Sequence, residues 1–325
     1  MDSNLYLATT SGLVIAEKAG DTWRISGRPL EGQHVTSVIA REGVILVGTR
    51  NGIFRSDDAG HSWDEANSGL TQRHVRWMAY HPDRSDLEYA GTEPAAIFVS
   101  HDGANTWRQC AEVATLRDRF KWFLPYSPEA GCVRGFAFHG ARAYAAVEVG
   151  GLLRSDDSGA TWALAAGSDG IPRFGAPAAG FIHPDVHSVV VHPSSNDLVY
   201  CPTGGGFYRS TNGGRTWTFH YDRYCRAVWV DPTDPDHLVL GPADDVNHNG
   251  RIEESHDGGA SWAMASTGVA VPWSRGMVER FAQVGDDLLA VLSNGQLLAA
   301  PLSTLSWRRI LPDIANVHAA TTMAD

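Results

Sequence analysis

The chain has 325 residues, of which 43% are hydrophobic and 19% charged, a composition that excludes a disordered protein. The formal net charge of −11 argues against a nucleic-acid-binding surface, and no apolar run approaches the length of a membrane span. Four cysteines without metal-ligand spacing (Cys110, Cys132, Cys201, Cys225) and an N-terminus without a basic signal-peptide region predict a cytoplasmic protein with free thiols that binds neither nucleic acid nor membrane.

Seven of the eleven tryptophans end copies of one short motif. The first strong copy is SDDAGHSW at residues 56–63, and it returns at 100–107, 155–162, 210–217 and 255–262. Two degenerate copies, which match only the end of the motif, finish at Trp23 and Trp307. The seven tryptophans are spaced by 40, 44, 55, 55, 45 and 45 residues. A repeat of this length is typical of propellers and solenoids.

Each repeat contains four short β-rich runs, as in the runs at 186–192, 198–201 and 206–209 that precede the motif at 210–217. Four short strands make one propeller blade. The chain starts on a run typical of a second strand and ends, at 317–321, on one typical of a first strand. We therefore predict an all-β, seven-bladed β-propeller with four-stranded blades. It forms a single domain over residues 1–325, and the C-terminal strand closes the first blade.

The motif resembles the Asp-box (bacterial neuraminidase, BNR) repeat, S/T-x-D-x-G-x-T/S-W, of sialidase-like and photosystem-assembly-factor-like propellers, and the resemblance covers nearly the whole chain. In that family the Asp-box is a folding device on the turn between the third and fourth strands. The resemblance therefore implies structural roles for the motif residues. Sialidases are six-bladed and carry an early Arg-Ile-Pro motif, which Arg24-Ile25-Ser26 does not match, so a sialidase-type glycosidase is the least favoured function.

Propellers that resemble this one bind ligands at the channel mouth, where the innermost strands begin. At the strand starts, aligned positions such as Arg76 and Arg226 form a ring. Two residues before these ring positions, His74 and Tyr224 belong to a mostly polar layer, and two residues after them every residue is apolar, which predicts an apolar floor. Glu93 and Glu148, between second and third strands, are expected on the same face. The aligned positions themselves predict a polar ring: Thr36, Arg76, Arg134, His187, Arg226, Glu279 and His318.

Two long loops, at 108–133 and 163–186, are expected to overhang this mouth. Trp122, on the first of them, and Trp273, on the next longest loop, are predicted to contribute to the binding site. Trp77 and Trp229 lie on innermost strands and are expected to pack.

Three convergent arginines favour a small anionic ligand with a carboxylate, phosphate or sulfate group. His187, His318 and Glu279 can move protons near neutral pH, so the sequence favours a hydrolase or lyase in which the arginines clamp the substrate. No cofactor is predicted, although the same three residues form a possible divalent-metal site. Two alternatives stay open: a self-satisfied network of ion pairs, and a non-catalytic scaffold or assembly module that binds a protein partner.

Overall fold

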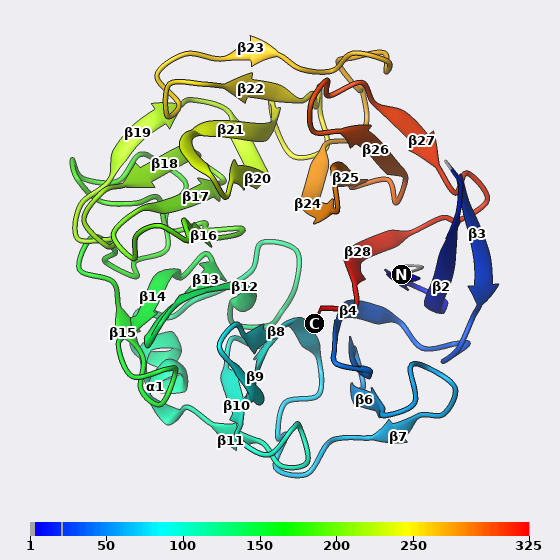
Figure 1. Ribbon diagram of the computed structural model, residues 1–325. Helices are drawn as coiled ribbons and strands as arrows, with labels where there is room; N and C mark the ends of the chain where they lie inside the picture. The colour runs from blue at the N-terminus through cyan, green and yellow to red at the C-terminus, as the bar shows by residue number, and fades with distance from the viewer. Residues whose placement is uncertain (1–3, 21, 325) are drawn as a thin grey trace.

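The computed structural model describes residues 4–20 and 22–324, which form seven four-stranded antiparallel sheets arranged as blades around a central channel (Figure 1). From the channel outward, blade 1 contains β28 (Val317–Thr322), β1 (Asn4–Thr9), β2 (Gly12–Ala19) and β3 (Thr22–Gly27). Blade 2 contains β4 (Val35–Arg41), β5 (Val44–Thr49), β6 (Gly52–Ser56) and β7 (Asp64–Glu65). Blade 3 contains β8 (Val75–His81), β9 (Arg84–Thr92), β10 (Ile97–Ser100) and β11 (Arg108–Gln109).

The remaining four blades follow the same order. Blade 4 contains β12 (Cys132–His139), β13 (Arg142–Glu148), β14 (Gly151–Ser155) and β15 (Ala163–Leu164). Blade 5 contains β16 (Val190–Val191), β17 (Val199–Thr203), β18 (Gly206–Ser210) and β19 (Thr218–Tyr221). Blade 6 contains β20 (Tyr224–Asp231), β21 (Asp234–Ala243), β22 (Glu253–Ser255) and β23 (Ala263–Met264). Blade 7 contains β24 (Val278–Val284), β25 (Asp287–Leu292), β26 (Leu297–Pro301) and β27 (Arg308–Ile310).

The predicted seven-bladed, four-stranded architecture is confirmed, and so is the closure of the first blade. β28 pairs antiparallel with β1, with Leu7 opposite Ala320, and thereby supplies the innermost strand of blade 1 (Figure 1). Closure pairs the inner edge of blade 1, which a linear array would leave exposed. All four cysteines are buried and free, as predicted.

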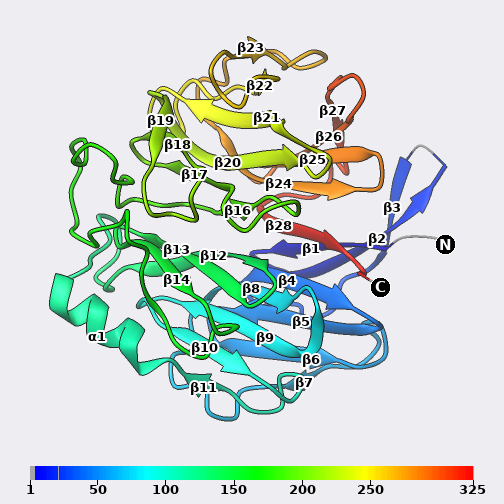
Figure 2. The ribbon, with the colours of Figure 1, turned by 60° about the vertical axis from the view of Figure 1, so that its left-hand side comes forward.

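One helix, α1 (Ala111–Phe120), was not expected. It lies in the first long loop, on the outer side of the ring, where Val113, Leu116 and Phe120 pack against the core between blades 3 and 4. Figure 2 shows α1 and the loop between β15 and β16 toward the side on which β28 begins. Both long loops therefore lie on the side of the ring that carries the channel mouth, but none of the described residues of the second loop lines the pocket there. No helix among the described residues is long and apolar enough to cross a bilayer.

The repeated motif has the same hydrogen-bond pattern in the four copies with aspartate at the third position, whereas Asn212 in the copy at 210–217 donates its amide N–H to the Thr216 hydroxyl. At 155–162, the Asp157 carboxylate accepts hydrogen bonds from the Thr161 amide at 2.9 Å and from the hydroxyls of Ser155 and Thr161 at 2.7 and 2.6 Å. The Ser155 hydroxyl in turn accepts from the amide of Gly159, which has a left-handed φ of 74°. Trp162 packs in the core between blades 3 and 4. The motif is a folding device here, as the resemblance implies.

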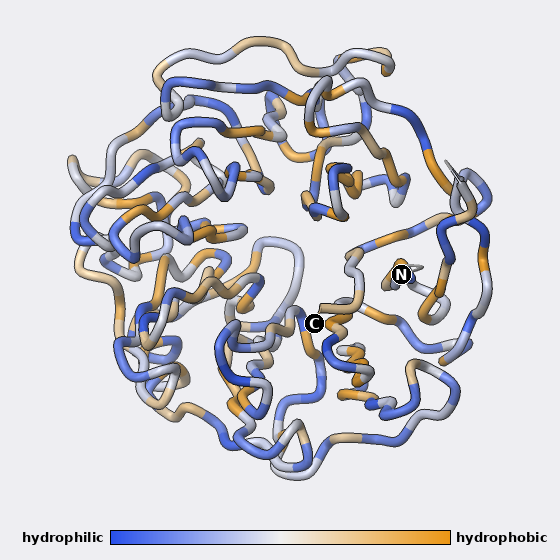
Figure 3. Tube along the Cα trace, viewed as in Figure 1, coloured by the Kyte–Doolittle hydropathy of each residue, from blue (hydrophilic) through white to orange (hydrophobic). Residues whose placement is uncertain are grey.

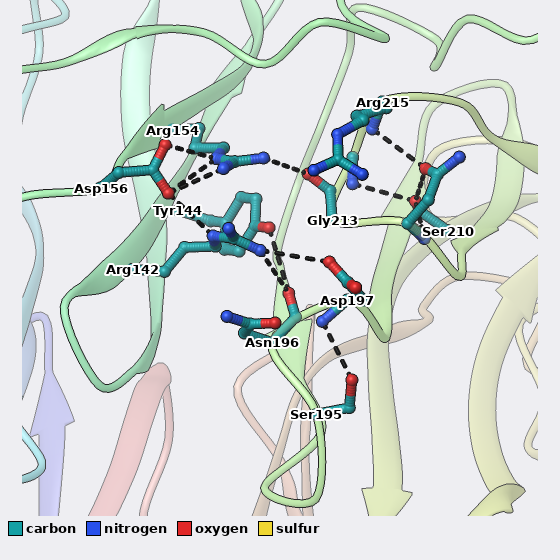
Figure 4. A network of polar contacts seen from close by, with 12 residues as sticks. Arg142, Tyr144, Arg154, Asp156, Ser195, Asn196, Asp197, Ser210, Gly213 and Arg215 are labelled. Carbon is teal, nitrogen blue, oxygen red and sulfur yellow. Dashed lines mark hydrogen bonds and ion pairs between the residues drawn. The ribbon is translucent and has the colours of Figure 1, made fainter.

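Arginines next to the motif join neighbouring blades on the side opposite the channel mouth. Figure 4 shows Arg154, which precedes the motif of blade 4, held by Asp156 while its Nη1 donates to the carbonyl of Gly213 in blade 5 at 3.0 Å. Arg142 contacts Asp197 across the same boundary at 3.2 Å. Apolar residues concentrate on the strands, and much of the outer rim is hydrophilic (Figure 3).

Candidate functional site

A pocket of about 370 Å³ occupies the channel at the face where the inner strands begin. Seven of the residues that line the pocket were predicted from the sequence: Thr36, His74, Arg76, Arg134, Arg226, Glu279 and His318. Eight others complete the lining: His34, Arg50, Trp77, Tyr126, Arg280, Leu292, Ser293 and Val317.

A β-bulge at the start of the inner strands aims the ring residues into the channel. The pairing register shifts between Val35 and Ser37 in β4 and between Val75 and Trp77 in β8. It also shifts in the same region of β12, β20 and β24. The ring residue falls within the shift and is left without a regular partner, and the bulge interrupts the alternation of side chains. In two of these strands the next residue also faces the pocket, namely Trp77 and Arg280.

The predicted apolar floor is wrong for the same reason. The residues two positions beyond the ring pack into the cores between blades: Val38, Met78, Phe136, Val189, Val228, Phe281 and Ala320. In their place, the Arg280 guanidinium stacks 4.0 Å from the ring centroid of Trp77. Its Nη2 donates to the backbone oxygen of Arg134 at 2.6 Å, so a side chain from blade 7 reaches across the channel to blade 4.

Three of the pocket arginines are paired with carboxylates. Arg134 is the centre of the network: its Nη1 lies 2.8 Å from Glu148 and its Nη2 lies 3.3 Å from Glu279. Arg226 also pairs with Glu279. Although burial acts in the opposite direction, Arg226 and Arg134 hold the pKa of Glu279 below its usual value. Glu279 is therefore an ionised partner of two arginines.

On the other side of the pocket, Arg76 pairs with Glu93 at 2.8 Å. The second oxygen of Glu93 accepts a hydrogen bond from the Ser127 hydroxyl at 2.7 Å, which ties the loop before β12 to the pocket wall. Tyr126 of this loop lines the pocket, and Figure 1 shows the loop reaching over the centre of the ring. The first long loop thus overhangs the mouth, as predicted.

His187, Tyr224 and Glu148 do not line the pocket but lie behind its arginines. His187 is 1% exposed; its Nδ1 lies 3.2 Å from Nη1 of Arg134 and its Nε2 3.3 Å from Asp185. Nδ1 must accept from the guanidinium, so Nε2 carries the proton. The hydroxyl of Tyr224 accepts from Nε of Arg226 at 2.9 Å. These residues position the arginines.

His187 differs from the other ring residues because its strand starts late. β16 begins only at Val190, and Val186 makes an isolated bridge to Thr203. Without a regular strand start there is no bulge to turn the side chain into the channel, and His187 stays in the wall.

Neither tryptophan predicted for the mouth lines the pocket. Trp122 is 3% exposed, packs in the core beside α1 and donates its indole N–H to the carbonyl of Gly170 at 2.9 Å. Trp273 packs against the core between blades 6 and 7 and forms a backbone bridge with Gly250. Long loops need their own apolar anchors, and these tryptophans serve that purpose.

Two pocket guanidinium groups, those of Arg50 and Arg280, have no carboxylate within ion-pair distance among residues 4–20 and 22–324. Burial, together with the charge of Arg134, lowers the pKa of Arg280 to about 9. A lowered arginine pKa marks a cation that is short of negative charge. Arg50 and Arg280 are residues that the alignment of strand starts missed.

Three histidines from consecutive blades line one side of the pocket. His34 stacks on His318 with ring centroids 5.1 Å apart. Burial, Arg50 and the neighbouring imidazoles lower the pKa of His34 to about 4. Burial also lowers the pKa of His74 and of His318, against the opposing charges of Glu93 and Glu279. All three rings are therefore neutral at pH 7.

The suggested metal site of His187, His318 and Glu279 is not assembled. Among the described residues, two clusters bring at least three histidine or carboxylate donors within 4.8 Å of one another, and neither contains His318 or Glu279. One cluster unites His187 with Glu148 and Asp185, but Nη1 of Arg134 already contacts Glu148 at 2.8 Å and His187 at 3.2 Å. A cation there would meet a guanidinium, so the pocket chemistry suits an anion.

No protein-family model and no curated protein matches the chain. Among solved structures, the ring resembles an ancestral GH74 enzyme with a TM-score of 0.63 and 16% identity, over 98% of this chain and 40% of that one. It also resembles YCF48 bound to D1 peptide, with a TM-score of 0.62 and 14% identity, over 93% of this chain and 89% of that one. YCF48 from Cyanidioschyzon merolae matches with a TM-score of 0.59 and 13% identity, over 93% and 97% of the two chains.

The chain thus spans 40% of the length of the GH74 enzyme and most of the length of YCF48. Identities this low establish a shared fold and nothing finer. The sialidase-type glycosidase gains no support, because the structure has seven blades and Arg24 lies on an outer strand with its side chain 75% exposed.

Proposed function

We propose that this propeller binds a small, doubly charged anion in the channel-mouth pocket. The observation that carries the proposal is an imbalance of charge. Five guanidinium groups line the cavity, whereas within the described part of the chain only three carboxylates contact them: Glu93, Glu148 and Glu279. Two positive charges are left over: Arg280 is partly buried, where an unpaired charge is costly, whereas Arg50 is exposed at the edge of the pocket. A phosphate, a sulfate or a dicarboxylate supplies the missing charge.

The shape of the pocket favours a ligand larger than an inorganic anion. A volume of about 370 Å³ lies at the lower end of the range for small-molecule sites. The anionic group would lie against Arg280 and Arg50, while Leu292, Val317 and the ring of Trp77 offer apolar surface for an attached organic part. We therefore favour a small organic phosphate, sulfate or dicarboxylate.

The pocket also supports a revised version of the proposed acid–base chemistry. Glu279 lines the cavity but is held ionised between two arginines, and His187 is buried behind Arg134, so we assign neither as the group that exchanges a proton with the ligand. His318 and His74 line the cavity, and their buried Nε2 atoms have no hydrogen-bond partner among the described residues. In a hydrolase or lyase reaction these two imidazoles would exchange a proton with the bound substrate.

Removing either unpaired cation is expected to weaken anion binding. Arg50→Ala and Arg280→Met each remove one charge-assisted contact, worth about 1.5–3 kcal/mol, so each should weaken phosphate or sulfate binding by about tenfold or more. Isothermal titration calorimetry measures the affinities. Arg24→Ala is the matched control, because Arg24 is an exposed arginine far from the pocket. Equal affinity in the wild type and both pocket variants would refute the proposal.

Sulfate affinity is expected to increase about tenfold from pH 8 to pH 5, because protonation of the pocket histidines adds positive charge. Sulfate keeps its double charge over this range. The histidine pKa values are lowered in the folded protein, so without a ligand the stability they contribute is present above the unfolded value of about 6.5 and is lost as pH falls below it. Bound sulfate should reduce this loss of stability at low pH. Calorimetric Tm values measured with and without sulfate check this. The groups involved are His34, His74, His318, Arg50, Arg76, Glu93 and Glu279.

A second candidate is a scaffold that captures an acidic group of a protein partner in the same pocket. It is favoured by the likeness to YCF48 bound to D1 peptide, over 89% of that chain. The two candidates differ in size selectivity. A small-molecule site binds isolated organic anions tightly, whereas a scaffold binds acidic peptides tightly and single anions only as weak competitors.

A further inference from the structure

Blade 6 carries a cluster of two histidines and one carboxylate outside the pocket. The Nε2 atom of His237 lies 2.8 Å, and that of His256 lies 3.3 Å, from the same oxygen of Glu254. The donor atoms all lie within 4.8 Å of one another. The cluster is close to the hairpin between β20 and β21, at the far end of the inner strand. It therefore lies on the opposite side of the ring from the pocket.

The strand register explains how these residues meet. Leu238 pairs with Ser255 and Val239 with Glu254, so one further step along the strands places His237 opposite His256. Their rings stack with centroids 4.4 Å apart. Glu254 lies on the same face, because side chains two positions apart share a face of a strand. The cluster is therefore built on regular strand pairing.

The second ring nitrogen of His237 is already oriented. Its Nδ1 lies 3.1 Å from Asp231, and Trp229 packs edge-on against the ring at a centroid distance of 5.4 Å. A carboxylate that accepts a hydrogen bond from Nδ1–H leaves the Nε2 lone pair free for a metal, the usual support of a metal-binding histidine. Asp231 thus fixes the tautomer of His237 that binds a cation.

The distances suit a small divalent cation. Ligand atoms in a tetrahedral site with bonds of about 2.0–2.1 Å lie roughly 3.3 Å apart. Glu254 and His256 have this separation, and Glu254 and His237 are 0.5 Å closer. The His256 side chain is 67% exposed, so its ring can turn out of the stack and direct Nε2 toward the same point as His237.

Comparison among the blades shows that this cluster replaces a structural contact. Blades 2, 4 and 5 have an arginine immediately before the motif serine: Arg55, Arg154 and Arg209. Arg154 and Arg209 donate to glycine carbonyls of the next blade. Blade 6 has Glu254 at this position. A glutamate thus stands where three other blades have an arginine, and two histidines lie beside this glutamate. A purely structural role for the repeat does not require this combination.

We propose that His237, Glu254 and His256 bind a divalent transition-metal ion of the zinc class, with Asp231 as the outer carboxylate that orients His237. Two histidines and one carboxylate leave a fourth position open to water or to a ligand from a partner. The site is independent of the anion pocket, and it joins β21 and β22, the two middle strands of blade 6.

Untagged protein treated with chelator and then titrated with Zn²⁺ tests the proposal, with Co²⁺ absorption as a readout of coordination geometry. The wild type is expected to bind one equivalent. His256→Ala and Glu254→Gln should weaken binding at least tenfold, and Asp231→Asn by about 10–100-fold. His248→Ala is the matched control, because His248 is an exposed histidine of the same blade outside the cluster.

Each outcome decides the question. One equivalent that is lost in His256→Ala but kept in His248→Ala supports the site, particularly with the intense visible absorption of tetrahedral Co²⁺. Binding below one equivalent, equal binding in the wild type and His256→Ala, or equal losses in both histidine variants would overturn it. Circular dichroism of each variant verifies that the ring is folded.

Discussion

Arg134→Met is expected to lower the free energy of unfolding by about 3–5 kcal/mol, the usual loss when one partner of a buried ion pair is removed. Arg134 is 8% exposed and contacts Glu148, which is 3% exposed, as well as Glu279. Methionine fills much of the space of the arginine stem, so the loss comes mainly from the carboxylate left without a partner. Urea denaturation at pH 7 measures it.

The pH dependence and a double variant separate this explanation from a packing defect. Burial alone would raise the pKa of Glu148, but the charge of Arg134 holds this pKa well below its usual value. The stability that this pair contributes is therefore present above the unfolded pKa of about 4.3 and is lost as pH falls below it. The difference in unfolding free energy between the wild type and Arg134→Met should therefore decrease toward low pH. Adding Glu148→Gln should restore part of the stability at pH 7; no restoration would show that packing dominates.

Trp162→Ala is also expected to cost about 3–5 kcal/mol, because it leaves a large cavity in the core between two blades. Trp162 is 4% exposed and packs in one cluster with Tyr89, Phe136 and Leu153. Its backbone N–H also donates to Glu112 of α1 at 2.9 Å, so the loss should extend to the helix. Thermal and urea unfolding measure the stability.

Trp23→Ala is the matched comparison. Trp23 ends a degenerate copy of the motif and is only partly buried, so its truncation should cost about 2 kcal/mol or less. If both variants lost the same stability, the quality of the motif copy would have no bearing on packing. Trp162→Phe, which keeps an aromatic ring in the core, should fall between the wild type and Trp162→Ala.

Much of the candidate site could be predicted because the repeat makes positions equivalent. Aligned strand starts placed Arg76, Arg134 and Arg226 around one cavity, and the structure brings them together. Arg50 lies in the connection between the second and third strands of blade 2. The corresponding connections of blades 3 and 4 had pointed to Glu93 and Glu148, so the same reasoning applied to blade 2 would have found Arg50.

Trp77 and Arg280 could not be found by strand alternation. A bulge adds one residue on one side of a strand pair, and strict alternation assigns every residue beyond it to the wrong face. The same step misplaced Val38 and Met78, which pack between blades instead of forming a floor. The prediction that His187 faces the channel was wrong for a related reason, because its strand begins only at Val190.

The amino-acid sequence by itself determined the number of blades, the closure by β28 and three of the arginines that meet at the channel, Arg76, Arg134 and Arg226. These follow from local signals, turn chemistry and periodicity, that repeat at a fixed spacing. Only the tertiary structure decided which side chains face the pocket and which charges are neutralised. Those properties depend on bulges and on contacts between blades far apart in the chain, such as Arg280 with the backbone of Arg134. The excess of positive charge that defines the pocket arises from such contacts, because the sequence gives the number of charges but not their partners.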